Sequence, residues 1–190
     1  MTKNIMIVGV GGQGSLLASK LLGHMLLEQG YDVKVSEVHG MSQRGGSVVT
    51  YVRFGEKVYS PIIDKGEADF IVSFEKLEAA RWMEYLKPGG RIIVNTQEVD
   101  PMPVITGAAT YPTDLIEKMR ALGAQVDDMD ALSIATEAGS SKAVNLVLMG
   151  RLSRYFEEVS EQAWQDAIDA CVPAKFLELN HKAFAMGRAE

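Results

Sequence analysis

Ile5-Met6-Ile7-Val8-Gly9-Val10-Gly11-Gly12-Gln13-Gly14 is the stretch that decides the fold. Four apolar residues followed by glycines are typical of a short strand buried on both faces of a sheet. The glycines fit the pattern G-x-G-x-x-G, which permits a tight turn and a close approach to the backbone. Apolar residues then recur at helical spacing from Gln13 to Gln29, and a second strand ends near Glu37. The chain therefore opens with the βαβ unit of a Rossmann-like fold.

The rest of the chain continues this alternation and then becomes helical. Residues 47–54 predict a strand that turns at Gly55 into a second hairpin arm at 57–59. Strands are also expected at 69–74 and 91–95, with helices at 75–86 and from Asp114, where Glu117 completes a capping pattern. Helices are expected at 130–138, 142–156, 160–171 and 174–187. We expect one α/β domain over residues 1–190: a mostly parallel sheet flanked by helices, with a β-hairpin insertion and a helical C-terminal third.

Composition excludes several classes of protein. The net charge of −6 over 190 residues offers no basic stripe for a nucleic acid. The chain has no apolar run of membrane-spanning length, and its N-terminus does not read as a signal peptide, so a cytoplasmic protein is expected. Its one cysteine, Cys171, cannot supply the four thiolates of an iron–sulfur cluster. We interpret Cys171 as a small buried hydrophobic residue rather than as a nucleophile.

The first glycine motif has several interpretations by itself. A turn of this kind after a strand is the fingerprint of dinucleotide binding, and Glu37 stands where an acid could accept a ribose hydroxyl. A free-standing NAD-dependent oxidoreductase or a regulatory nucleotide-binding module fits these features. The alternative interpretation is that the glycines only let the helix pack tightly on the sheet. Weaker local matches are to class I methyltransferases, through Leu86–Val94, and to ubiquitin-activating-type adenylyltransferases.

A second motif follows the second strand: Glu37-Val38-His39-Gly40-Met41-Ser42-Gln43-Arg44-Gly45-Gly46-Ser47. A dinucleotide-binding protein has no need for this string. Together with the first motif it resembles the gamma-type domain of pyruvate and other 2-oxoacid:ferredoxin oxidoreductases, and among them the small subunit of the indolepyruvate enzymes. The resemblance covers nearly the whole chain, including Asp130-Ala131, Gly139 and the stretch Asn145–Gly150.

The resemblance implies a subunit rather than a complete enzyme. The family reaction is oxidative decarboxylation of a 2-oxoacid to an acyl-coenzyme A, with electrons passed to ferredoxin, and it uses thiamine diphosphate, Mg²⁺ and [4Fe–4S] clusters. This chain lacks a thiamine diphosphate signature and the cysteines for a cluster. A larger partner subunit is therefore expected to carry these cofactors and to deliver electrons to ferredoxin, with coenzyme A at the interface. Indolepyruvate and other arylpyruvates are the substrates that the resemblance favours.

The candidate site consists of the two glycine-rich segments, which we expect side by side at the carboxyl ends of the first two strands, facing a cofactor or the partner's active site. Arg44 suits a phosphate or carboxylate, or a surface salt bridge. His39 could move protons, or act as a hydrogen-bonding strut. No catalytic residue and no metal site is assigned; Asp127, Asp128 and Asp130 read as a solvated turn with helix-capping aspartates. The full set of candidates is Gly9, Gly11, Gly12, Gln13, Gly14, His39, Gly40, Ser42, Gln43, Arg44, Gly45 and Gly46.

Overall fold

The computed structural model describes residues 2–37 and 41–190. In this part of the chain, six strands form one sheet in the order β2-β3-β1-β4-β5-β6. Their bounds are β1 (Lys3–Val10), β2 (Asp32–Glu37), β3 (Ser47–Gly55), β4 (Ala68–Ser73), β5 (Leu86–Asn95) and β6 (Gln125–Met129). β1, β4, β5 and β6 are mutually parallel, and β3 runs antiparallel to both β1 and β2. The mostly parallel sheet expected from the sequence is confirmed.

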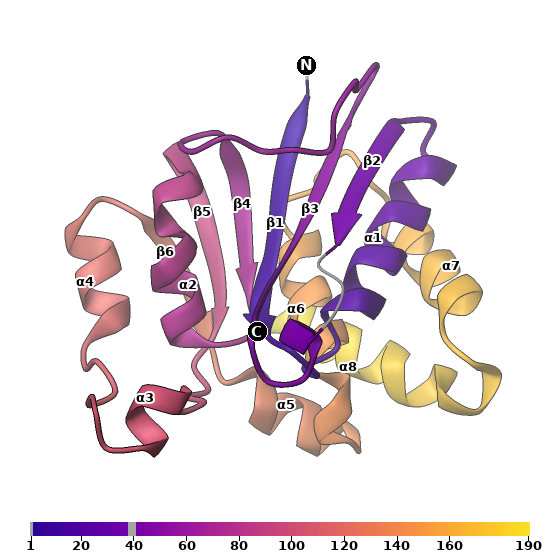
Figure 1. The fold of residues 1–190 in the computed structure, drawn as a ribbon. Coiled ribbons are helices and arrows are strands. Elements are labelled where there is room, and N and C mark those ends of the chain that lie inside the picture. Colours follow the sequence, from indigo (N-terminus) through magenta and orange to yellow (C-terminus); the bar gives the residue numbers. More distant parts are fainter. Residues whose placement is uncertain (1, 38–40) are drawn as a thin grey trace.

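The helices lie on both faces of the sheet (Figure 1). Their bounds are α1 (Ser15–Glu28), α2 (Lys76–Trp82), α3 (Met102–Ile105), α4 (Leu115–Ala121), α5 (Ala131–Ala138), α6 (Val144–Ser153), α7 (Glu161–Cys171) and α8 (Leu177–Ala189), with short 3-10 turns η1 (Met41–Gln43), η2 (Met83–Tyr85), η3 (Ser141–Ala143) and η4 (Ala174–Phe176). No helix in the described residues is long and apolar enough to cross a membrane. The helical C-terminal third is confirmed.

Side chains that alternate along the strands fill two cores. Ile5 and Ile7 of β1 pack toward α1 and the C-terminal helices, whereas Met6 and Val8 pack toward α2 and α4. All four side chains are fully buried, as the apolar run predicted. The parallel strands point their carboxyl ends to the lower edge of the sheet in Figure 1, where the loops that carry the candidate residues gather.

The predicted hairpin is placed differently from the expectation. Residues 57–59 form no strand; β3 instead pairs with β2, from which only residues 38–46 separate it. A parallel neighbour would need a crossover of a dozen or more residues, so this short connection makes β3 antiparallel. The segment after β3 crosses the sheet and is held by Arg53, which donates hydrogen bonds to the carbonyl oxygens of Ser60 (3.0 Å) and Ile62 (2.7 Å).

Two expectations about aspartates are wrong. Asp127 and Asp128 belong to β6 rather than to a turn, and Asp127 is only 9% exposed because its carboxylate pairs with Arg151. Asp114 does begin a helix, but it has a left-handed backbone (φ 57°) and its side chain makes no capping hydrogen bond. Asp130 does cap α5, accepting a hydrogen bond from the Ser133 amide at 2.9 Å.

Candidate functional site

The first glycine loop, residues Gly9–Gly14, joins β1 to α1 and is closed by its own glutamine. The amide of Val10 donates to Gln13 Oε1 at 2.7 Å, and Gln13 Nε2 donates to the Phe74 carbonyl oxygen at 3.3 Å. Gly12 and Gly14 have φ values of 99° and 93°, a backbone region that glycine adopts at little cost. Gln13 therefore braces the loop on the end of β4.

The second glycine loop, of which the structure describes residues 41–46, lies directly against the first. The amide of Gly11 donates to the Gly46 carbonyl oxygen at 2.8 Å. A Cβ atom on Gly11 would lie 2.2 Å from the Ser42 carbonyl oxygen, so only glycine fits. The two loops thus lie side by side, as expected from the sequence.

The remaining candidates of the second loop differ in their surroundings. Ser42 and Gln43 belong to η1, and Gln43 helps line a cavity beside the first loop. Arg44 is exposed and has no ion pair within the described residues, so the salt bridge considered for it is not seen there. Gly45 adopts a φ of 90°. His39 and Gly40 lie outside the described residues.

Two cavities flank the first glycine loop. One, of about 280 Å³, lies between this loop, Gln43 and the start of β3. The other, of about 540 Å³, lies between the loop, Gln97, Leu132 and the turn Ser141–Lys142. In the sequence, Gly139-Ser140-Ser141 only separates the helices expected at 130–138 and 142–156, and nothing in it indicates a return to the first loop. Asn145 fixes this return, donating from Nδ2 to the Gly14 carbonyl oxygen at 3.3 Å.

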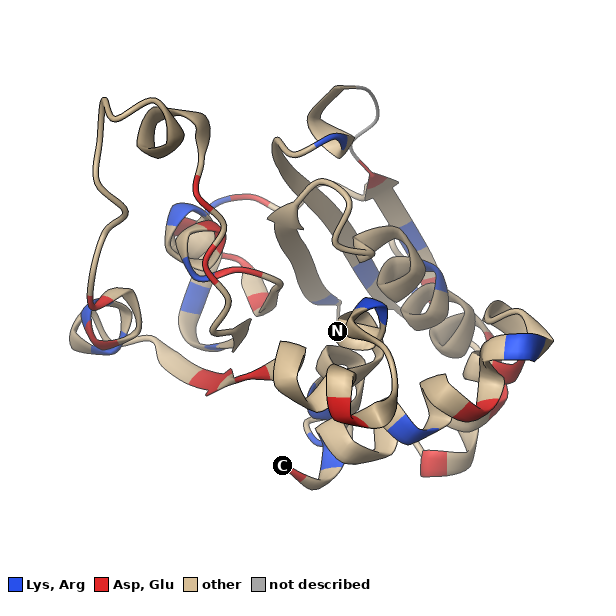
Figure 2. Cartoon of the chain, turned by 90° about the horizontal axis from the view of Figure 1, so that it is seen from below, with Lys and Arg blue, Asp and Glu red and all other residues tan. Residues whose placement is uncertain are grey.

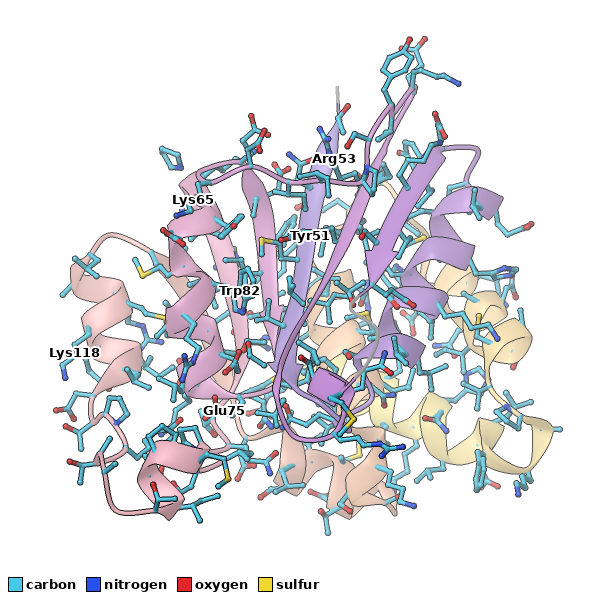
Figure 3. All side chains as sticks on the ribbon, in the orientation of Figure 1. Tyr51, Arg53, Lys65, Glu75, Trp82 and Lys118 are labelled. Carbon is cyan, nitrogen blue, oxygen red and sulfur yellow. The ribbon has the colours of Figure 1, made fainter. Side chains whose placement is uncertain are left out.

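Two buried glutamates form a part of the site that sequence reasoning missed. Glu75 is 1% exposed and Glu78 is 5% exposed, and both line a cavity of about 280 Å³ beside Gly45 and Gly46. Figure 3 shows Glu75 near the lower end of the sheet, below Trp82. In the sequence both are acids near the start of a helix, where exposure is usual and the helix dipole favours negative charge. The one signal in the sequence is that Glu75 stands at the N-cap position immediately after the apolar strand, which indicates a helix cap but not the burial of either acid.

Glu75 binds two points of the segment that follows β5, one at Val99 and one at Tyr111. Its Oε1 accepts hydrogen bonds from the Val99 amide at 3.3 Å and from the Tyr111 hydroxyl. Burial and the adjacent carboxylate raise the pKa of Tyr111 above its ordinary value, so this hydroxyl stays a donor at neutral pH. The arm, residues 101–113, begins two residues after Val99 and contains Tyr111; it has no charged side chain and is tan throughout in Figure 2.

Residues that supported the dinucleotide interpretation make contacts inside the protein. Glu37 accepts a hydrogen bond from the Ser19 hydroxyl at 2.6 Å, which ties the end of β2 to α1. The backbone beside Gly11, where a pyrophosphate would approach, is covered by Ser42 and Gln43. Cys171 is buried, as predicted, and burial raises the pKa of its thiol. In the described residues, no group of three His, Cys, Asp or Glu side chains is arranged to hold a metal ion.

Comparison with known proteins supports the family resemblance over nearly the whole chain. A family model described as pyruvate ferredoxin/flavodoxin oxidoreductase matches residues 4–190. The chain is 45% identical to the indolepyruvate oxidoreductase subunit IorB of Thermococcus kodakarensis, over 97% of this chain and 93% of that one. It is 31% identical to the 2-oxoglutarate synthase subunit KorC of Methanothermobacter marburgensis, over 99% of this chain and 96% of that one.

Solved structures share the fold. The pyruvate oxidoreductase subunit PORC of Thermotoga maritima superimposes with a TM-score of 0.76 at 21% identity, covering 100% of this chain and 96% of that one. The 2-oxoglutarate:ferredoxin oxidoreductase of Magnetococcus marinus superimposes with a TM-score of 0.74 at 20% identity, where 99% of this chain matches 30% of the longer one. Family model, relatives and fold agree, and the chain belongs to the pyruvate ferredoxin/flavodoxin oxidoreductase family.

Proposed function

We propose that this chain is the iron–sulfur-free subunit of a cytoplasmic 2-oxoacid:ferredoxin oxidoreductase that acts on indolepyruvate and related arylpyruvates. The observation that carries the proposal is the 45% identity to an indolepyruvate oxidoreductase subunit across nearly the full length of both chains. The complex would decarboxylate the 2-oxoacid oxidatively, form the acyl-coenzyme A and pass electrons to ferredoxin. With a single cysteine, this chain needs a partner subunit for the clusters, and the same partner would hold thiamine diphosphate and Mg²⁺.

In this proposal the two glycine loops face the partner's active site and help to admit coenzyme A. Their contact at the carboxyl edge of the sheet supports this role, because ligands of open α/β sheets bind outside that edge. Exposed Arg44 on one loop and Lys142 beside the larger cavity supply positive charge for the phosphates. Arg44 has the planar donor geometry that suits a phosphate.

Reconstitution tests the proposed function. The chain would be co-expressed with the proposed thiamine diphosphate subunit from the same organism and assayed for coenzyme A-dependent reduction of ferredoxin. Indolepyruvate should support turnover better than pyruvate or 2-oxoglutarate, and neither subunit should be active alone. A chain that purifies by itself, binds NAD tightly and turns over a substrate would contradict the proposal in favour of a free-standing enzyme. Nucleotide binding without turnover would favour a regulatory module.

Arg44→Ala tests the role of the second loop. In the assembled complex, this variant should raise the KM for coenzyme A several-fold, because one charge-assisted contact is removed. Arg154→Ala is the matched control, since Arg154 is also an exposed arginine without an ion pair in the described residues. An intact Arg44→Ala complex with unchanged KM and turnover would remove Arg44 from the site.

A further inference from the structure

Glu78 reaches from α2 to the second glycine loop. Ser47, the first residue of β3 and the neighbour of Gly46, donates its hydroxyl hydrogen to Glu78 Oε2. The other carboxylate oxygen lies 3.2 Å from Arg81 Nε. Glu78 is 5% exposed, so these two contacts replace much of the water that a surface carboxylate would bind.

The partners of Glu78 differ from those of Glu75, although the two acids are one helical turn apart. Glu75 Oε2 accepts a hydrogen bond from the Glu78 amide at 2.9 Å and so caps α2. The other carboxylate oxygen of Glu75 accepts a hydrogen bond from Tyr111 in the arm. Glu78 is directed to the glycine loop instead. Burial raises the pKa of the Glu78 carboxyl, and the hydrogen bond from Ser47 and the charge of Arg81 act in the opposite direction.

The other anchors at this end of the described part of the second loop are backbone contacts, among them the pairing of Ser47 with Val10 in the ladder between β1 and β3. The Gly46 amide donates to the Ser42 carbonyl oxygen at 3.0 Å, a bond within the loop itself. The Gly46 carbonyl oxygen accepts from Gly11 at 2.8 Å, which joins it to the first loop. Gly45 and Gly46 have no side chains with which to bind anything else. The Ser47 hydroxyl is therefore the side-chain contact that ties this end of the loop to the helix layer.

We propose that Glu78 is a positioning residue: through the Ser47 hydroxyl it fixes the second glycine loop, and with it Arg44, at the carboxyl edge of the sheet. The inference deepens the proposed function and rests on it for the role of the loop toward coenzyme A. The position of the loop itself can be measured in the free chain.

Trypsin cleavage after Arg44 reports the position of the loop, because Arg44 is exposed and Gly45 follows it. Ser47→Ala and Glu78→Ala should each speed this cleavage about tenfold, since losing a hydrogen bond to a charged group favours local opening by about that factor. Ser47→Thr and Glu78→Gln keep a donor and an acceptor and should cleave nearly as slowly as the wild type. Cleavage after exposed Lys175 serves as the internal control for global unfolding and should not change.

The double variant Ser47→Ala/Glu78→Ala should cleave no faster than either single variant, because both remove the same contact. Additive effects, or wild-type cleavage in the two alanine variants, would overturn the contact as the anchor of the loop.

The same variants in the assembled complex separate positioning from general stability. Both alanine variants should raise the KM for coenzyme A several-fold with a smaller change in kcat, and the Thr and Gln variants should restore the wild-type KM. An active wild-type complex in which both alanine variants keep the wild-type KM overturns the positioning role. A wild-type complex without coenzyme A-dependent turnover would instead contradict the proposed function. The rate of trypsin cleavage would still decide whether Glu78 holds the loop.

Discussion

Gly11 packs so closely on the second glycine loop that its missing side chain decides whether the two loops can meet. The atoms that a Cβ would strike, the Ser42 carbonyl oxygen at 2.2 Å and the Gln43 carbonyl carbon at 2.4 Å, belong to the backbone and cannot rotate away. The glycine pattern that reads as a nucleotide fingerprint in the sequence is used at this position for contact within the protein. A pattern of glycines records where backbones approach closely, and the sequence does not say which backbone or ligand approaches.

Gly11→Ala should therefore lower the free energy of unfolding by about 1–3 kcal/mol, the usual range for overpacking. Gly23→Ala is the matched control: this glycine lies inside α1, and its nearest neighbour would be Val35 Cγ2 at an ordinary 3.7 Å. It should raise stability by about 0.5–1 kcal/mol, because alanine is the better helix former. Urea denaturation of both variants checks the pair, and a shift of the same sign in both would contradict the packing argument.

Asp127 gives a second test at this scale. Burial opposes ionisation of this carboxyl, but hydrogen bonds from Arg151 and Tyr155 and the charge of Arg151 lower its pKa below the ordinary value. Arg151 binds it with two nitrogens, at 2.7 and 2.8 Å. Asp127→Asn should cost about 3 kcal/mol at neutral pH, because it leaves a buried guanidinium without its partner.

The pH dependence of that loss has a definite sign. Since the folded pKa lies below the unfolded value of about 3.9, the contribution of the ion pair is complete above that value and disappears as pH falls through the folded pKa. The stability difference between wild type and Asp127→Asn should be constant from pH 6 to 8 and shrink below about pH 4. Asp128→Asn, whose carboxylate is 33% exposed beside Arg120, should cost less than about 1 kcal/mol. A loss for Asp127→Asn that stays constant down to pH 3 would show that the pair contributes little.

At the scale of elements, the sequence predicted which segments become strands and helices better than it predicted their neighbours. The run Ile5–Val8 and the C-terminal helices follow from local apolar spacing and were found. The insertion of β3 between β1 and β2 depends on long-range pairing, such as Val8 opposite Val49, which local periodicity does not contain. The prediction of a second hairpin arm failed for a similar reason, since the Val58 amide donates a hydrogen bond at 2.9 Å to Asp32, the first residue of β2, which lies 26 residues away in the sequence.

The predictability of the site has the same limit. Both glycine loops could be found because glycine leaves a local signature, and their contact could be expected because they follow the carboxyl ends of the first two predicted strands. Glu75 and Glu78 could not, because an acid in the first turn of a helix looks the same in sequence whether it faces water or a neighbouring loop. Their burial depends on Val99, on Tyr111 of the arm and on Ser47, which lie 24 to 36 residues away along the chain.

The stabilities of two helix-cap variants can test whether an aspartate before a helix acts as its cap. Asp114 and Asp130 both precede helices, but only Asp130 accepts a capping hydrogen bond in the structure. Asp130→Ala should cost about 1 kcal/mol of stability. Asp114→Gly should leave stability unchanged or raise it by up to about 1 kcal/mol, because glycine relieves a left-handed backbone at φ 57°. Thermal unfolding by circular dichroism checks both, and a loss at Asp114 as large as that at Asp130 would show that Asp114 also caps its helix.

On the scale of the whole molecule, the two cores lie on the two faces of one sheet, and one of them joins residues from both ends of the chain. The core under α1 includes both Ile5 and Phe184, so the C-terminal helices complete a layer that β1 begins. α6 and α8 cross so closely that a Cβ on Gly187 would lie 2.1 Å from the Val147 carbonyl oxygen. The sheet itself is common to both cores, since neighbouring residues of β1 point into different ones. From this arrangement we predict that the described residues unfold as a single cooperative domain.

The two tryptophans lie on opposite faces of the sheet and can test that cooperativity. Trp164 is fully buried in the core that α7 and α8 cover, and Trp82 packs against the core under α2 and α4. Trp82→Phe and Trp164→Phe leave one reporter each. In each variant the denaturation curve from fluorescence should coincide with that from far-UV circular dichroism, as two-state unfolding requires. Midpoints that differ between the two methods would mean that one helix layer can detach while the sheet persists, because each core would then depend on its own helices more than on the strands they share.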